Sequence, residues 1–335
     1  MSTITVSIIL CTRNRADSLI PTLESIGKVT VPKEWKVELL VVDNGSTDQT
    51  SAAVGGARLS NVTLRYVNEP RPGQCHARNT GLRETTGEII LFTDDDIRVP
   101  TDWVEAMCKP ILGKGADAVA GGVLFPPHIA SVLTPPPFSS LRNWFASTEG
   151  LDPDQPARMV GANMAFHRRA LQLVPEFDVE LGPGALGFGD ETLFSRQLLA
   201  AGCKLVSALD VAVEHHFDSS RLTGEGLLDL ARKMGRTHAF VFHHWDHKRL
   251  RLAHPRLILS GLKLHWARFS DWLTGSGNFG VSLSTIEAEQ DYSFYCGYLI
   301  QRQRRRKYSL HGLVPLDLPP EASLPNPSSA SRNSP

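Results

Sequence analysis

Three consecutive carboxylates, Asp94, Asp95 and Asp96, directly follow the apolar segment 88–93. Such an apolar run predicts a buried strand, so the acids would stand at the carboxyl edge of a sheet, where open α/β sheets bind ligands. Side chains alternate along an extended chain, so Asp94 and Asp96 would share a face. Like charges repel unless a cation offsets them, and Mg²⁺ and Mn²⁺ both prefer carboxylate oxygens. The triplet therefore predicts a divalent metal site, with a solvated acidic loop as the alternative.

Polar side chains also follow the other strand-like segments of the first half. Thr12 and Arg15 come after the first, Asp43 after the second, and Arg78 after the third. The segment 43–48 can be explained as a tight turn with a helix cap, because its residue types favour both. The carboxyl ends of parallel strands, however, lie along one edge of a sheet. A crevice built there suits a ligand with a hydrogen-bonding base, a ribose and a charged diphosphate.

Strand-like and helix-like segments alternate over the first 125 residues, which predicts an α/β fold with a mostly parallel, doubly wound sheet. Several strand segments are apolar throughout, as in sheets covered on both faces. The strand candidates are Val6–Cys11, Val37–Val42, Thr63–Val67, Ile89–Thr93 and Ala118–Ala120, and the helix candidates are Ser18–Ile26, Gln74–Thr85 and Asp102–Leu112.

The second half is less regular. Prolines at 126–127 and 135–137 exclude long regular elements, so residues 125–158 are expected to form a surface excursion. Further strands are expected at 160–166, 204–207 and 211–215, and helices at 190–201, at 225–243 and over most of 254–307. We therefore expect a catalytic domain over residues 1–245, a helical C-terminal extension over 246–312 and a disordered tail over 313–335.

Composition narrows the class of protein. The 335 residues are 41% hydrophobic and 21% charged, as in soluble globular proteins. Lys plus Arg and Asp plus Glu both total 35, so bulk charge gives no support for nucleic-acid binding. The five cysteines are scattered without a Cys-x-x-Cys pair, which favours a reducing compartment over disulfides or a zinc site. The N-terminus is interpreted as a strand, not a signal peptide, and a cytoplasmic protein is expected.

Four segments, Val6–Arg15, Val41–Asp48, Ala77–Gly81 and Phe92–Asp96, resemble the successive motifs of family 2 glycosyltransferases, which have the GT-A fold. Each motif alone is weak, but their order and spacing agree over roughly residues 4 to 240. The resemblance implies an inverting enzyme that uses a nucleotide-diphosphate sugar, with UDP as the expected nucleotide. It also implies a sugar or lipid-linked acceptor and a role in cell-surface polysaccharide biosynthesis.

The resemblance also assigns roles around the donor. Asp43 would bind the nucleobase, and Asp96 would ligate Mg²⁺ or Mn²⁺ on the diphosphate, with Asp94 and His215 as further ligands. A structural histidine and a solvated arginine are the alternatives for His215 and Arg221. The nucleotide-sugar-binding residues implied are Thr12, Arg15, Asp43, Arg78, Asp94, Asp95 and Arg221.

Segment 187–194 occupies the place of the family's Gly-Glu-Asp motif, but here the order is Asp190 then Glu191. Alignment puts Glu191 at the general base, yet the swap leaves open which carboxylate takes the acceptor's proton. The alternative is an Asp helix cap followed by a Glu in the first turn. Gly189 and Asn163 are implied on the acceptor side, with a plain sheet strand as the alternative for Asn163.

Two other segments invite functional interpretations. Gly182–Gly187 spells Gly-x-Gly-x-x-Gly, but no convincing strand precedes it, so we predict a flexible loop over the active site and not a dinucleotide site. Leu262–Leu273 carries two tryptophans, and a basic run spans 302–307. Together they could hold the protein at an anionic inner membrane face. Packing of the aromatic residues on the catalytic domain is the interpretation that we favour.

Two rival functions stay open at this point. A nucleotidyltransferase can use a similar sheet and metal, but it usually has a glycine-rich phosphate loop after the first strand, and Cys11–Arg15 contains no glycine. A non-catalytic nucleotide-sugar-binding protein could keep the fold, although the complete acidic set argues against it.

Overall fold

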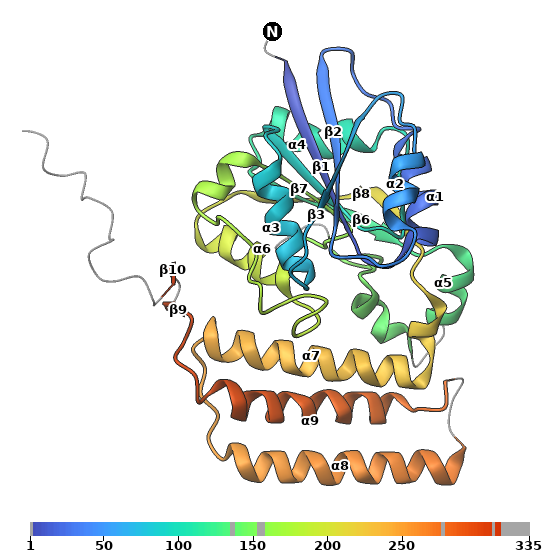
Figure 1. Cartoon of the computed structure of the whole chain (residues 1–335). Coiled ribbons are helices and arrows are strands. Elements are labelled where there is room, and N and C mark those ends of the chain that lie inside the picture. Colours follow the sequence, from blue (N-terminus) through green and yellow to red (C-terminus); the bar gives the residue numbers. More distant parts are fainter. Residues whose placement is uncertain (1–2, 135–137, 153–157, 276–278, 310–311, 316–335) are drawn as a thin grey trace, which may run out of the picture.

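The computed structural model of the chain describes residues 3–134, 138–152, 158–275, 279–309 and 312–315. One large sheet forms the centre, with helices on both faces and a layer of three helices at one end (Figure 1). Its strands are β1 (Ile4–Thr12), β2 (Trp35–Asp43), β3 (Thr63–Asn68), β4 (Ile89–Thr93), β5 (Ile97–Arg98), β6 (Ala118–Leu124), β7 (Asn163–His167) and β8 (Leu205–His215). The α-helices are α1 (Ala16–Ile26), α2 (Thr50–Gly56), α3 (Gln74–Glu84), α4 (Trp103–Lys114), α5 (Pro127–Leu133), α6 (Asp190–Ala200), α7 (Gly224–His244), α8 (Ala253–Thr274) and α9 (Leu283–Gln301).

The described residues also form several shorter elements. Turns of 3-10 helix are η1 (Phe138–Phe145), η2 (Arg168–Gln172) and η3 (Ser219–Leu222), and β9 (Tyr308–Ser309) pairs with β10 (Gly312–Pro315). Of the tail expected over 313–335, residues 316–335 lie outside the described residues. None of the described helices is both long enough and apolar enough to cross a bilayer.

The order of strands in the sheet is β3-β2-β1-β4-β7-β6-β8-β5. Strands β3, β2, β1 and β4 run parallel, as expected from the alternation of strands and helices. Strand β7, however, runs antiparallel to both β4 and β6. The long segment 125–162 joins β6 to β7 and lets β7 run in the opposite direction. The α/β prediction is confirmed, and the sheet is mixed.

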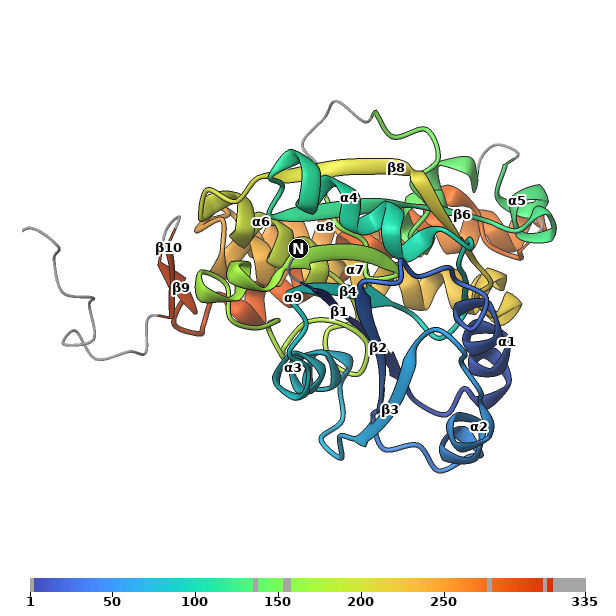
Figure 2. The same cartoon turned by 90° about the horizontal axis from the view of Figure 1, so that it is seen from above.

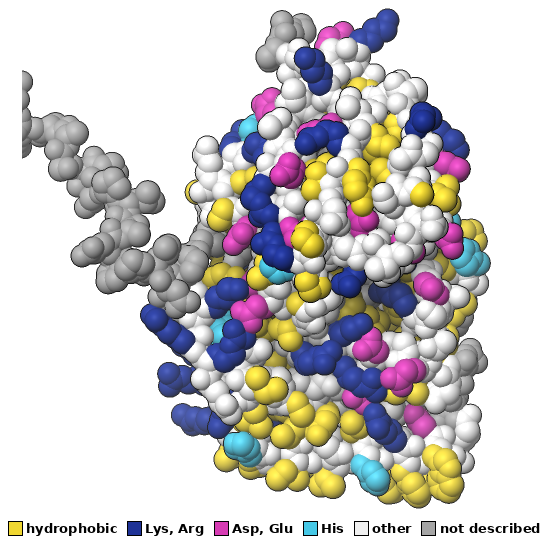
Figure 3. Space-filling model, viewed as in Figure 1, with side chains coloured by type: hydrophobic (Ala, Val, Ile, Leu, Met, Phe, Trp, Pro, Cys, Tyr) yellow, Lys and Arg dark blue, Asp and Glu magenta, His cyan; other side chains and the backbone are white. Residues whose placement is uncertain are grey.

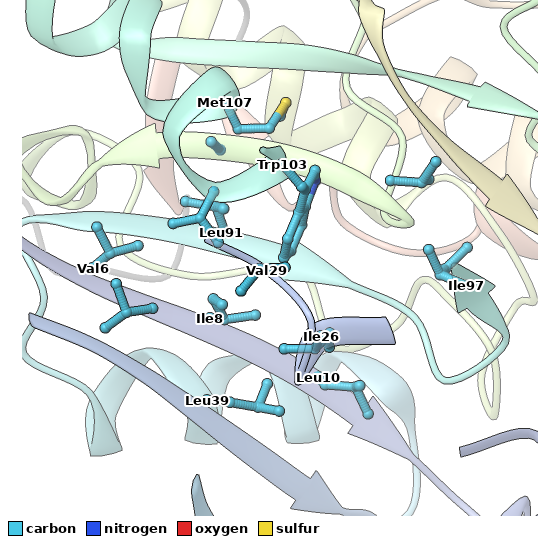
Figure 4. Packing of buried hydrophobic residues seen from close by; sticks show 14 of the residues in the cluster. Val6, Ile8, Leu10, Ile26, Val29, Leu39, Leu91, Ile97, Trp103 and Met107 are labelled. Atoms are coloured by element: carbon cyan, nitrogen blue, oxygen red, sulfur yellow. The ribbon is translucent and has the colours of Figure 1, made fainter. Parts of the chain in front are cut away.

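Both faces of the sheet are covered, which explains why the strands are apolar throughout. In β1, Ile8 and Leu10 pack with α1 and α4, including Trp103 (Figure 4). The residue between them, Ile9, points to the opposite face and packs with α3 and α6. Figure 2 shows α3 on one side of β1–β3 and α1 and α2 on the other. Because the side chains of the central strands alternate between two buried faces, most of their positions are apolar.

Segment 125–158 departs from the expected surface excursion. It contains α5 and η1, and Ile129, Leu141 and Phe145 are buried in a cluster that also includes residues of α7. Pro127 stands at the start of α5, where a missing N–H costs nothing, so the proline begins a helix instead of excluding one. The two strands expected at 204–207 and 211–215 are the single strand β8, whose pairing with β6 shifts register once.

Three helices form the C-terminal layer (Figure 1). Helix α9 lies between α7 and α8, and a buried carboxylate links all three. Glu289 of α9 accepts hydrogen bonds from Arg232 of α7 at 3.1 Å and from Arg268 of α8 at 2.5 Å. The predicted helical extension is therefore present, and it is fastened to the α/β part through α7.

One glycine of the Ala77–Gly81 motif is explained by packing. Helix α3 lies so close to β1 that a Cβ on Gly81 would stand 2.4 Å from Cγ2 of the buried Ile9. We expect Gly81→Ala to lower the free energy of unfolding by about 1–3 kcal/mol, because the overpacked helix must shift. Gly55→Ala on exposed α2 is the matched control, since its Cβ meets nothing within 4 Å and should be neutral or mildly stabilising. Urea unfolding of both variants measures the difference, and equal effects would contradict this explanation.

Candidate functional site

A cleft of about 520 Å³ lies between the carboxyl ends of β1 and β4 and helix α7. Most of the residues singled out from the sequence line it. They come from strand ends, from α3, from the N-terminus of α6 and from the segment before α7, and comprise Thr12, Arg15, Arg78, Asp94, Asp95, Asp96, Gly189, Asp190, Glu191, His215 and Arg221. The fold thus gathers residues that are more than two hundred positions apart in the sequence.

Within the acidic triplet, Asp95 faces β1. Its Oδ2 accepts the Thr12 hydroxyl at 2.7 Å, and Arg15 lies 3.4 Å from its Oδ1. Burial raises the pKa of Asp95 to about 7, although Arg15 opposes the shift. The chain turns at Asp95 and Asp96, so the expected alternation of an extended strand does not continue. Asp94 and Asp96 nevertheless both line the cleft.

Asp96 is buried between two basic groups. Arg15 lies 2.9 Å from its Oδ2, and His215 Nε2 lies 3.3 Å from its Oδ1. Burial favours the neutral acid, but His215 and Arg15 outweigh it and hold the pKa of Asp96 below its usual range. His215 Nδ1 lies 3.0 Å from the carbonyl oxygen of Phe145, which can accept the Nδ1 proton and leave the Nε2 lone pair facing Asp96. The site therefore presents an imidazole nitrogen beside an ionised carboxylate that Arg15 also contacts.

This donor set fits Mg²⁺ or Mn²⁺ chemically. Such ions are often bound by one or two carboxylates together with water and substrate phosphates, and imidazole also suits Mn²⁺. Asp94, Asp96 and His215 supply these ligand types at one end of the cleft. Among the described residues, however, no group of three or more His, Cys, Asp or Glu side chains is already placed to hold a metal ion.

Arg78 forms the centre of the cleft. Its Nη1 makes a short ion pair with Asp190 and lies 3.8 Å from Oε2 of Glu191, while Nη2 lies 3.8 Å from Asp94. The guanidinium also stands over the ring of Phe177, 5.4 Å from its centroid. Burial would raise the pKa of Asp190, but Arg78 more than offsets it and keeps this carboxylate ionised. Arg78 is therefore a buried cation shared by three acids.

The two acids of α6 have different surroundings. The Asp190 side chain is only 2% exposed, whereas that of Glu191 is 23% exposed. Burial and the neighbouring Asp190 raise the pKa of Glu191 well above its usual range. The N-cap is Gly189, with φ at +83°, so the alternative of Asp190 as helix cap is wrong. Glu191 is therefore the more exposed of the two acids and the one whose pKa is raised.

Two predicted residues do not reach the cleft. Asp43 ends β2, but its oxygens accept the N–H of Ser46 at 2.8 Å and the hydroxyl of Tyr66 at 2.7 Å, and it is not among the lining residues. Asn163 is fully buried in β7. Its amide donates to the carbonyl oxygens of Gly122 and Val211, and its oxygen accepts the indole N–H of Trp103 at 2.9 Å. Asn163 therefore behaves as the alternative proposed, a residue of a plain sheet strand, and its acceptor-side role is not supported.

Other lining residues were not predicted from the sequence. Asn44, after β2, lines the cleft and accepts the N–H of Gly73 at 2.8 Å. Trp144 comes from η1, and Thr237 and His238 come from α7. Asn44 stands in a recognised motif and could have been found there. The others carry no local signal, because only the packing of α7 and η1 against the sheet brings them to the cleft.

The Gly182–Gly187 segment lies where the sequence suggested. Pro183 and Gly184 line the cleft, and the carbonyl oxygen of Pro183 accepts the N–H of Gln74 at the start of α3. Gly182, Gly184 and Gly187 all have positive φ, between 78° and 113°. The segment is therefore a glycine-dependent loop beside the site and no part of a strand-to-helix nucleotide motif.

The fold and this cleft define a GT-A type α/β protein with C-terminal helices. The structure is similar to that of mannosyltransferase PcManGT from Pyrobaculum calidifontis, solved in complex with GDP-Man and Mn²⁺. The TM-score is 0.53 at 20% sequence identity, over 89% of this chain and 74% of that one, which shows a shared fold. Residues 7–174, half of the chain, match the family model for glycosyl transferase family 2. The chain belongs to glycosyl transferase family 2.

Two curated relatives are similar to part of the chain. Glycosyltransferase AglE of Haloferax volcanii is 35% identical over 122 residues, which are 36% of this chain and 40% of the relative. Succinoglycan biosynthesis protein ExoM of Rhizobium meliloti is 33% identical over 122 residues, 36% of this chain and 39% of the relative. The similarity thus spans about two fifths of the length of each of these relatives.

Proposed function

We propose that the chain is an inverting glycosyltransferase that moves a sugar from a nucleotide-diphosphate sugar to an acceptor hydroxyl. The observation that carries the proposal is the division of one cleft by Arg78. On one side lie Asp94 and Asp96, suited to a donor diphosphate and its cation, and on the other lies the accessible Glu191. Family membership favours sugar transfer over nucleotidyl transfer.

The proposed chemistry is a single displacement. Glu191 takes the proton of the acceptor hydroxyl as its oxygen forms a bond to the anomeric carbon. The bond from that carbon to the diphosphate oxygen breaks, and its electron pair leaves with the diphosphate. Asp190, paired with Arg78, keeps negative charge next to Glu191 and so raises its proton affinity. Attack from the face opposite the leaving group inverts the configuration, and no enzyme nucleophile is needed.

The leaving diphosphate needs positive charge around it. Asp94, Asp96 and His215 would hold Mg²⁺ or Mn²⁺, which when bound neutralises charge on the diphosphate. The fold match to a protein solved with GDP-Man and Mn²⁺ supports this cofactor class. Arg15 and Arg221 line the same end of the cleft and add charge from the chain itself.

UDP remains the nucleotide that we expect from the family resemblance, and a sugar or lipid-linked acceptor remains the expected partner. The relative ExoM is a succinoglycan biosynthesis protein, which supports a role in cell-surface polysaccharide biosynthesis. We also propose that residues 1–245 form the catalytic unit, because α7 is the last helix to contribute residues to the cleft lining.

Turnover of nucleotide sugars tests the proposal. The chain is incubated with UDP-, GDP- and dTDP-sugars in Mn²⁺, in Mg²⁺ and in EDTA, and release of nucleoside diphosphate is measured. We expect release from one donor class with a divalent cation and loss of release in EDTA. Pyrophosphate release from a nucleoside triphosphate would instead establish nucleotidyl transfer, and binding without any turnover would establish a non-catalytic protein.

Arg221 should contribute directly to donor affinity. Its guanidinium lies over the rings of Phe145 and Phe217, 5.4 and 5.1 Å from their centroids, and no carboxylate of a described residue forms an ion pair with it. Such a cation is available for phosphate oxygens. We expect Arg221→Ala to weaken nucleoside-diphosphate binding roughly 10- to 100-fold. Calorimetry measures the change, with Arg65→Ala on exposed β3 as control; equal affinities for both variants would contradict the role.

A further inference from the structure

The outward face of α8 is apolar. This helix is the outermost element of the C-terminal layer (Figure 1), and its inner residues Ser260 and Leu264 are buried. Its other side carries Ile258, Leu262, Trp266, Phe269 and Leu273, all exposed. Their spacings of four, four, three and four residues place them on one stripe of the helix. Apolar side chains gather along this edge of the molecule in Figure 3. A surface helix normally turns such a stripe toward the core, and α8 turns it away.

Trp266 of this stripe and the neighbouring Trp272 do not pack on the catalytic part, contrary to the interpretation favoured from the sequence. Trp266 is 70% exposed and Trp272 is 75% exposed. Phe269 lies between them, with its ring centroid 5.9 Å from that of Trp266 and 5.8 Å from that of Trp272. Leu259 of α8 and Leu252 just before it are also exposed, whereas the remaining exposed large apolar residues of the described chain lie outside α8. A contiguous apolar surface of this kind marks an interaction site.

The charges around the stripe are basic. Arg256 and Lys263 are exposed on α8, and Arg251 precedes it. The single acid of the helix, Asp271, is turned toward the segment before α9, where it accepts the N–H of Ser282 at 3.0 Å. Aromatic and aliphatic side chains flanked by Lys and Arg are typical of helices that lie in a membrane interface and attract anionic lipids.

We propose that α8 docks the protein on an anionic membrane surface, with its axis in the plane of the bilayer. The apolar stripe would enter the boundary between headgroups and acyl chains, and Arg256 and Lys263 would contact lipid phosphates. A second copy of the chain fits less well, because α8-to-α8 pairing would bring basic flanks together without acids to balance them. This surface is separate from the cleft and does not depend on the chemistry proposed there.

Vesicle flotation of the full chain tests the proposal. Vesicles of phosphatidylcholine alone are compared with vesicles enriched in phosphatidylglycerol, at low and high salt. We expect binding to the anionic vesicles that weakens as salt screens the basic residues. Absence of binding, or equal binding to both kinds of vesicle at both salt concentrations, would overturn the proposal.

Variants locate the surface. Trp266→Ala/Trp272→Ala and, separately, Arg256→Glu/Lys263→Glu should each weaken binding to anionic vesicles at least about tenfold. All four side chains are exposed, so unfolding midpoints should be unchanged. Leu112→Ala/Leu173→Ala, two exposed leucines on other parts of the molecule, is the matched control and should bind as the unmodified chain does.

Light scattering after gel filtration tests the competing outcome, in which a second copy of the chain covers α8. If the unmodified chain is a dimer, fails to bind vesicles and dissociates in the Trp266→Ala/Trp272→Ala variant, a second copy covers α8 and the membrane proposal is wrong. A monomer that binds anionic vesicles through the same two tryptophans supports it.

Discussion

Glu191→Gln is expected to lower the rate of sugar transfer about 10²- to 10⁴-fold while leaving donor affinity unchanged. Glutamine keeps the size and hydrogen-bonding reach of the side chain but cannot accept a proton from the acceptor hydroxyl. Glu191 lies on the side of Arg78 away from the acidic triplet, so its loss should spare the donor site. Steady-state kinetics give the rate, and calorimetry with the nucleoside diphosphate gives the affinity.

Asp190→Asn is the matched control for this assignment. Asp190 is the buried partner of Arg78, so its neutralisation should cost about 3–5 kcal/mol of folding stability. Glu191→Gln should cost much less, because Glu191 is partly exposed and only 3.8 Å from the same guanidinium. Normal turnover by Glu191→Gln, together with a folded but inactive Asp190→Asn protein, would move the base assignment to Asp190. A pH–rate profile adds a second readout, since the raised pKa of Glu191 predicts a rate that falls as pH drops through that pKa.

Asp96→Ala is expected to remove the dependence of donor binding on Mn²⁺ or Mg²⁺. The pKa of Asp96 is held below its usual range, and its carboxylate lies beside His215 at the wall of the cleft. Asp96 is therefore the strongest candidate for a metal ligand. Calorimetry with nucleoside diphosphate, in Mn²⁺ and then in EDTA, measures the effect. The affinity in Mn²⁺ should fall at least about tenfold, to the value measured in EDTA.

Asp102→Ala is a suitable comparison for Asp96→Ala. Asp102 is an exposed carboxylate just before α4, and its side chain makes no capping hydrogen bond. Its loss removes the same charge from the protein without touching the cleft. An Asp96→Ala protein that still binds the nucleotide more tightly in Mn²⁺ than in EDTA would exclude Asp96 as a metal ligand.

Local sequence patterns predicted the strands and helices in which apolar residues recur at a regular spacing or in a continuous run. The strand expected at Ile89–Thr93 matches β4, and the helix expected at 190–201 agrees with α6 to within one residue. A strand that is apolar throughout, such as β4, indicates burial on both faces, and the glycine after α6 indicates the end of a helix. The direction of β7 was not predictable, because direction depends on the path of the chain through segment 125–162 and not on the strand's own residues.

The same difference, between what local patterns show and what tertiary packing decides, applies to the site. Thr12 and the acidic triplet stand at the ends of strands, and Arg78 lies in α3, the helix that follows β3. Their place at the cleft therefore follows from the topology of the sheet. The two interpretations of Asn163 could not be separated from the sequence, because the sequence does not show which face of β7 its side chain occupies. The contributions of α7, such as Thr237, could not be foreseen, since they depend on tertiary packing between distant segments.

The arrangement of Arg78 has a thermodynamic consequence. One desolvated guanidinium, that of Arg78, is the shared counter-ion of Asp94, Asp190 and Glu191. Neutralising any one of these acids therefore leaves the guanidinium to interact more strongly with the other two. Substitutions on the two sides of the cleft should therefore be non-additive in a double-mutant cycle, although their carboxylates are not in contact.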